Sequence, residues 1–123
     1  MPNRNQKLGQ LGESLAVAHL KKKGYRILER NYRNLFGEID IIARHGESLV
    51  FVEVKSRRSD RYGGPKFALT SAKRKKISMV ALSYLKSMGN SRVKARFDVV
   101  AVGAGCDPPR IEVVRNAFEL AYP

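Results

Sequence analysis

Several residue types that build disulfide-rich or metal-binding domains are scarce in this sequence. It has one cysteine, Cys106, no tryptophan and two histidines, His19 and His45. One cysteine makes neither an intrachain disulfide nor a thiol-rich metal site, and the two histidines lack the partner spacing of a zinc site. The start shows no apolar segment typical of a secretion signal, and no run approaches the length of a membrane span. We therefore expect a cytoplasmic protein without a membrane partner.

Acidic residues are outnumbered more than two to one. Asp and Glu total 11 against 24 Lys and Arg, which gives a formal net charge of +13. A field of this sign attracts polyanions and speeds encounter with them. On charge alone nucleic acid is the commonest partner and an anionic membrane surface the second; we expect nucleic acid, with DNA favoured, and no membrane. A basic, solvated surface that serves no partner is the remaining interpretation.

The chain has 123 residues, 43% of them hydrophobic, which suits a single domain over residues 1–123. The first structural element predicted in it is a helix from about Gln6 to Lys23. Gly24 follows three lysines, as expected where a helix ends. The apolar stripe of this helix is predicted to consist of Leu8, Leu11, Leu15 and Ala18.

Strands are predicted at residues 37–44, 48–56, 96–102 and 110–114, where Ile, Val and Phe are frequent. Between the second and third of these, Thr70 or Ser71 begins a second helix that Gly89 closes. Its apolar positions are Ile77, Val80, Ala81, Tyr84 and Met88. The order of helix, hairpin, helix and two strands predicts an α/β fold with a mixed β-sheet and helices against it.

The predicted hairpin carries charged residues on one face. If Gly46 and Glu47 form a two-residue loop, Asp40 lies opposite Glu53, and Glu38 lies opposite Lys55. Side chains in such pairs are about 4.5–5.5 Å apart at Cβ, so two carboxylates there repel each other unless a cation lies between them. The alternative is that this face is simply the solvated side of the hairpin.

Glu13 extends this acidic group to the first helix. At about 100° per residue it lies at the edge of the apolar arc, on the side where Gly9, Gly12 and Ala16 allow the helix to approach a sheet closely. A carboxylate that points partly inward is costly unless something compensates it. Either a cation site or an ordinary salt bridge explains it.

These residues resemble the core of the PD-(D/E)XK nuclease superfamily. The stretch Gly37-Glu38-Ile39-Asp40, followed by Phe51-Val52-Glu53-Val54-Lys55, carries the resemblance. Together with Asn31-Tyr32-Arg33 and the late Arg96-Phe97-Asp98, it is similar to the small bacterial YraN-like family, which is grouped by fold with Holliday-junction resolvases. The resemblance covers nearly the whole chain and implies a restriction-endonuclease-like mixed β-sheet flanked by helices.

Carried onto this sequence, the resemblance implies that Asp40 and Glu53 are metal ligands and Lys55 the catalytic lysine. Glu13 matches the helix glutamate of resolvase-like members. The residue before Asp40, where the superfamily motif nominally has a proline, is Ile39 in this sequence. Hard carboxylate oxygens select Mg²⁺ or Mn²⁺, which polarises a phosphate and activates water. Lys55 is expected to position that water, because nearby carboxylates should raise its pKa and so disfavour a role as base.

Two basic segments are predicted to contact nucleic acid. A loop after the second strand carries Arg57, Arg58, Arg61 and Lys66. The first turns of the second helix carry Lys73, Arg74, Lys75 and Lys76, where cations oppose the helix dipole. Local stability does not favour that arrangement, whereas phosphate binding does. A solvated helix face and an exposed loop are the ordinary alternatives.

The function predicted from these observations is metal-dependent hydrolysis of phosphodiester bonds in DNA, with branched or flapped DNA in repair, recombination or DNA uptake implied by the resolvase resemblance. A non-catalytic nucleic-acid-binding module is the main alternative, and an RNA-directed protein a third. The resemblance also implies a homodimer. Phe118, Leu120 and Tyr122 form one candidate interface, unless they pack on the protein's own core.

Overall fold

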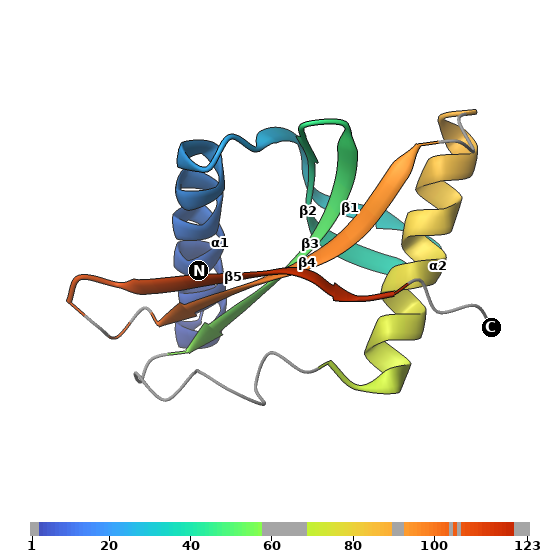
Figure 1. Ribbon diagram of the computed structural model, residues 1–123. Coiled ribbons are helices and arrows are strands. Elements are labelled where there is room, and N and C mark those ends of the chain that lie inside the picture. The colour runs from blue at the N-terminus through green and yellow to red at the C-terminus, as the bar shows by residue number, and fades with distance from the viewer. Residues whose placement is uncertain (1–2, 58–68, 90–92, 104, 106, 120–123) are drawn as a thin grey trace.

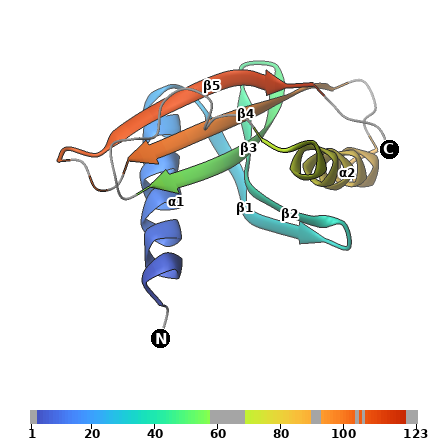
Figure 2. The same cartoon turned by 90° about the horizontal axis from the view of Figure 1, so that it is seen from below.

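Two helices lie on opposite faces of one five-stranded sheet in the computed structural model (Figures 1 and 2), which describes residues 3–57, 69–89, 93–103, 105 and 107–119. The strands lie in the order β1-β2-β3-β4-β5, with β3 and β4 parallel and all other neighbours antiparallel. The elements are α1 (Arg4–Lys22), β1 (Arg26–Asn34), β2 (Gly37–His45), β3 (Ser48–Arg57), α2 (Ser71–Ser87), β4 (Lys94–Gly103) and β5 (Arg110–Phe118). This confirms the predicted α/β fold with a mixed sheet and is consistent with a restriction-endonuclease-like architecture.

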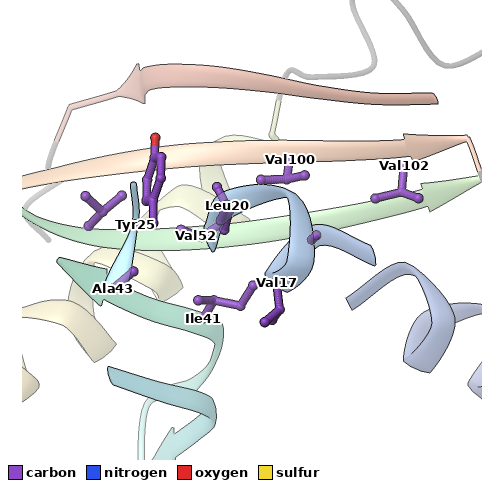
Figure 3. Packing of buried hydrophobic residues seen from close by; sticks show 10 residues of the cluster. Val17, Leu20, Tyr25, Ile41, Ala43, Val52, Val100 and Val102 are labelled. Carbon is purple, nitrogen blue, oxygen red and sulfur yellow. The ribbon is translucent and has the colours of Figure 1, made fainter. Parts of the chain in front are cut away.

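Helix α1 covers one face of the sheet with its small side chains. Ala16, Val17 and Leu20 are buried against β2, β3 and β4 (Figure 3). The predicted stripe is wrong at Leu11, which is 49% exposed, and at Ala18, which is also exposed. The reason lies at Gly12, where an added Cβ would overlap the Ser56 side chain of β3. The helix approaches the sheet at Gly12, and this turns the neighbouring Leu11 outward.

Helix α2 covers the other face and connects the parallel strands β3 and β4. Thr70 caps it by accepting a hydrogen bond from the Lys73 N–H, as predicted. Ile77, Val80 and Ala81 are buried as expected, but Met88 is 43% exposed because it is the C-cap residue. No described helix is both long and apolar enough to cross a membrane.

Of the three residues considered as a dimer interface, Phe118 takes the alternative and packs on the protein's own core. Phe118 is 8% exposed and stacks on Phe97 with ring centroids 4.6 Å apart, so it belongs to the core under α2. Leu120 and Tyr122 lie outside the described residues. Tyr84 also packs in this core, edge to face with Tyr32 and Phe51.

Strand β1 was not predicted. It pairs with β2 at the edge of the sheet, and a bulge interrupts its register between Ile27 and Glu29. Six of its nine residues have charged or amide side chains: Arg26, Glu29, Arg30, Asn31, Arg33 and Asn34. A bulged edge strand with this composition lacks the period-two apolar pattern by which strands are predicted.

Candidate active site

Asp40 lies where β2 separates from β3. The two-residue loop at Gly46 and Glu47 is as predicted, and the pairing of β2 with β3 runs from His45↔Ser48 to Ile41↔Val52. Beyond that point the Asp40 Oδ2 accepts a hydrogen bond of 2.8 Å from the Val54 N–H. After the backbone pairing ends, the Asp40 side chain therefore links β2 to β3, and its carboxylate lies between these two strands.

The two isoleucines beside Asp40 show the same break in the strand. Ile39 packs in the core under α2, whereas Ile41 packs in the core under α1. Residues two apart on a regular strand face the same side. The alternation of β2 thus changes phase at Asp40, which the sequence pattern did not indicate.

Glu38 does not take the partner predicted for it. In the β1–β2 ladder it lies opposite Arg33, and the Arg33 Nε donates to a Glu38 carboxylate oxygen at 3.1 Å. The predicted position opposite Lys55 is wrong, because the β2–β3 ladder ends before it reaches these residues.

Glu53 and Lys55 project from β3 on the α2 side of the sheet, as their spacing from the buried Phe51 requires. The Glu53 side chain is 13% exposed, and its carboxylate lies 3.3 Å from the Lys73 ammonium nitrogen in the first turns of α2. One cation of the predicted phosphate-binding helix therefore already serves as the counter-ion of a candidate metal ligand.

Glu13 reaches the site from α1. Its side chain is 14% exposed and accepts hydrogen bonds of 3.1 Å from the Arg30 Nε and the Asn31 Nδ2, both on β1. Asn31 has a left-handed φ of 53°, which is uncommon for a residue with a side chain and which aims the amide at this carboxylate. The ordinary salt bridge considered for Glu13 is present, with an arginine as its cation.

Burial and two carboxylate neighbours shift the titration of Asp40. Burial is the largest cause, followed by the negative charge of Glu53 and a smaller contribution of Glu13, and together they raise the pKa of Asp40 from 3.8 to about 7. The Val54 N–H and the Lys73 ammonium oppose this shift. The three predicted acids, which come from α1, β2 and β3, are thus close enough to interact electrostatically.

The expectation that carboxylates raise the pKa of Lys55 is wrong. Burial lowers the pKa of Lys55, Arg57 and Lys73 lower it further, and Glu53 alone among the named causes raises it. The prediction failed because it counted the three carboxylates of the site and left out burial, the largest cause, and the positive charges of Arg57 and Lys73.

Within the described residues, no three His, Cys, Asp or Glu side chains form a closed metal-binding group. Glu13 and Glu53 pair with Arg30 and Lys73. Mg²⁺ typically takes one or two carboxylates and completes its shell with waters and phosphate oxygens. The donor set of Asp40 and Glu53 fits such an ion, and Glu13 lines the same pocket as Asp40.

An open pocket of about 350 Å³ adjoins this acidic group. It lies between α1 and the β1–β2 hairpin and is lined by Gln6, Gly9, Gln10, Glu13, Asn31, Arg33, Asp40 and Val54. The contributions of Arg30, Asn31 and Arg33 were missed, because β1 was not recognised as a strand. The Asn31-Tyr32-Arg33 stretch was the available signal, since it was part of the family pattern.

The predicted nucleic-acid contacts fall into three groups. Arg57 is exposed at the end of β3, while Arg58, Arg61 and Lys66 lie outside the described residues. Lys75 and Lys76 are exposed on α2. Lys73 pairs with Glu53, and an Arg74 guanidinium nitrogen donates to the Ser71 hydroxyl at 3.4 Å.

The chain matches the model of a family described as uncharacterised protein family UPF0102 over residues 12–102. A UPF0102 protein of Syntrophus aciditrophicus is 55% identical over 118 residues, which cover 96% of this chain and 93% of that protein. UPF0102 proteins of Geobacter metallireducens and Desulfosudis oleivorans are 51% and 50% identical, cover 96% and 97% of this chain, and are covered over 97% and 95% of their lengths. The family match includes Glu13, Asp40, Glu53 and Lys55.

Proposed function

The chain belongs to the uncharacterised family UPF0102, and we propose that it is a metal-dependent endonuclease that hydrolyses phosphodiester bonds in DNA. We further propose that the family is part of the PD-(D/E)XK nuclease superfamily. Support comes from the mixed sheet and from the positions of Asp40, Glu53 and Lys55 on its central hairpin.

One observation carries this proposal. Asp40 is a partly buried carboxylate whose pKa is raised to about 7 by desolvation and by Glu53, on a protein with a formal net charge of +13. A chain with that many cations has ample means to neutralise an acid, so a carboxylate kept at a cost in stability needs another explanation. Binding of a divalent cation explains it, because the ion needs the ionised form and removes the repulsion.

The residues divide the proposed chemistry among them. Asp40 and Glu53 would hold Mg²⁺ or Mn²⁺, which when bound supplies Lewis-acid activation of the phosphate and of water. Lys55 orients the attacking water and stabilises negative charge on the phosphate, while burial lowers the pKa of its amine. Glu13 accepts hydrogen bonds from Arg30 and Asn31 and lines the pocket in which the sugar-phosphate backbone of DNA would bind.

A non-catalytic nucleic-acid-binding module is the second candidate. The Lys73–Glu53 and Arg30–Glu13 pairs favour it, because they already neutralise two of the three acids by ion pairs within the chain. A binding module needs no further ion, whereas a nuclease must exchange the Lys73 contact for a metal ion.

Metal binding and cleavage, measured separately, distinguish the two candidates. Calorimetry with Mn²⁺ should show binding to wild type and to Lys55→Ala, and loss of binding in Asp40→Asn. Labelled duplex, flap, junction and single-stranded DNA should be cut by wild type with Mg²⁺ or Mn²⁺ and remain intact with chelator. Lys55→Ala should reduce the rate at least 100-fold. Glu38→Gln, which removes a carboxylate from the same strand, should behave as wild type. Salt-dependent DNA binding without metal binding or cleavage would favour the module.

A further inference from the structure

The turn between β1 and β2 presents two large apolar side chains to solvent. Leu35 is 90% exposed and Phe36 is 43% exposed. Figure 2 shows the β1–β2 hairpin extending away from the other three strands, so its turn projects from the body of the protein. Single apolar residues on a protein surface are common and need no explanation. Adjacent exposed apolar residues, as at this turn, indicate a contact site.

Asn34 holds this turn in place. Its side-chain oxygen accepts a hydrogen bond of 2.9 Å from the Phe36 N–H, and its side-chain nitrogen donates to the Val80 carbonyl of α2 at 3.3 Å. The first bond fixes the turn, and the second ties it to a helix of the core. Leu35 is therefore presented outward by a preorganised turn, and its exposure does not depend on a loose loop.

An exposed arginine lies beside the tip. The Arg33 side chain is 77% exposed, pairs with Glu38 at 3.1 Å and lines the same pocket as Glu13 and Asp40, so a phosphate bound by Arg33 would share or replace the Glu38 contact. Phe36 is four residues from Asp40 along the chain, which is about 13 Å at the strand rise of roughly 3.3 Å per residue. The apolar tip, a cation and the candidate active site thus follow one another along one hairpin.

We propose that Leu35 and Phe36 form a wedge that stacks against an unpaired or unstacked base of the nucleic acid, while Arg33 contacts the adjoining phosphate. This rests on the proposed function and specifies its substrate as a helix with an interrupted base stack, such as a nick, a flap or a boundary between single and double strand. Apolar side chains of this kind act as wedges between base steps, and they enter most readily where stacking is already broken.

Binding measured in chelator tests the wedge without relying on catalysis. The probes are two oligonucleotides of identical sequence, an intact duplex and the same duplex with a flap, with 2-aminopurine beside the interruption. Wild type should bind the flap about tenfold more tightly, and the double variant Leu35→Ser with Phe36→Ser should lose that factor but bind the intact duplex within about twofold of wild type. Met88→Ala is the matched control, because Met88 has the same 43% exposure as Phe36 at the C-cap of α2.

A conservative variant and a mass measurement complete the test. Phe36→Trp should retain the preference for the flap. Because the natural sequence has no tryptophan, the fluorescence of the variant reports on position 36 alone, and stacking should quench it when the flap binds. Equal losses on both probes, or an unchanged 2-aminopurine signal, would overturn the proposal. So would a wild-type dimer that the double variant converts to a monomer, because the tip would then bind a second copy. A flap preference without cleavage would refute the nuclease and leave the wedge intact.

Discussion

Replacing Asp40 by asparagine measures what this carboxylate costs the metal-free protein. Asparagine has nearly the shape of the neutral acid, and its carbonyl oxygen can still accept the hydrogen bond that the Val54 N–H donates to Asp40. The substitution therefore removes mainly a negative charge that is buried beside Glu53. We expect Asp40→Asn to stabilise the protein, and to do so only where Asp40 is ionised.

The magnitude follows from the pKa. Asp40 titrates at about 7 in the folded protein, compared with 3.8 ordinarily. A shift of about three pKa units corresponds to about 4 kcal/mol. Because the folded pKa is the higher one, the folded state holds its proton more tightly, and stability is lost as the pH rises from about 4 to about 7. Asp40→Asn should equal wild type near pH 4 and exceed its unfolding free energy by about 2–4 kcal/mol at pH 8.

Urea denaturation followed by far-UV circular dichroism at pH 4.5, 6, 7 and 8, in chelator, measures this difference. Comparing two variants at each pH cancels the titration of groups common to both. Glu38→Gln is the control, since its carboxylate pairs with Arg33 at the surface, and it should change stability by about 0.5 kcal/mol or less at every pH. A difference between wild type and Asp40→Asn that stays flat with pH would refute the reasoning about burial.

Two other substitutions test the packing and charge around this site. Lys73→Met removes the counter-ion of Glu53. It should lower the unfolding free energy of the metal-free protein by about 0.5–1 kcal/mol and tighten Mn²⁺ binding several-fold in calorimetry. Weaker Mn²⁺ binding would contradict the role of Lys73 as an internal counter-ion. Gly12→Ala places a Cβ 2.8 Å from the Ser56 Cβ; α1 must move, so stability should fall by about 1–3 kcal/mol in urea melts. Gly9→Ala, which has open space, should instead add about 0.5–1 kcal/mol, and equal effects of the two alanines would contradict the close approach of α1 to β3.

The sequence by itself determined the elements that depend on local signals. Thr70 and Gly89 bound α2, and the loop at Gly46 and Glu47 sets the register of the central hairpin. These signals act over a few residues: a cap satisfies the N–H groups of the first turn, and a two-residue loop leaves one pairing for the strands that it joins. Continued by one position, this register predicted Asp40 directly opposite Glu53; the ladder ends at Ile41↔Val52, so that pairing is wrong, but the two carboxylates lie on neighbouring strands and interact electrostatically.

The tertiary structure decided how these residues meet. The bulged edge strand β1 supplies Arg30 and Asn31 to Glu13, and α2 supplies Lys73 to Glu53. Partners 17, 18 and 20 positions apart in the chain follow from how α1 and α2 dock on the sheet, since no periodicity links them.

The pKa of Lys55 and the divergence of the strands at Asp40 depend on the fold for the same reason. Burial and the charges of Arg57 on β3 and Lys73 on α2 determine the first. The second arises because β2 stays paired with β1 as far as Gly37, whereas its ladder with β3 on the opposite edge ends at Ile41. Desolvation and Coulomb interactions depend on distance in space. A chain read in sequence order shows which charges are present, and the packing of α1, α2 and β1 determines which of them act on one another.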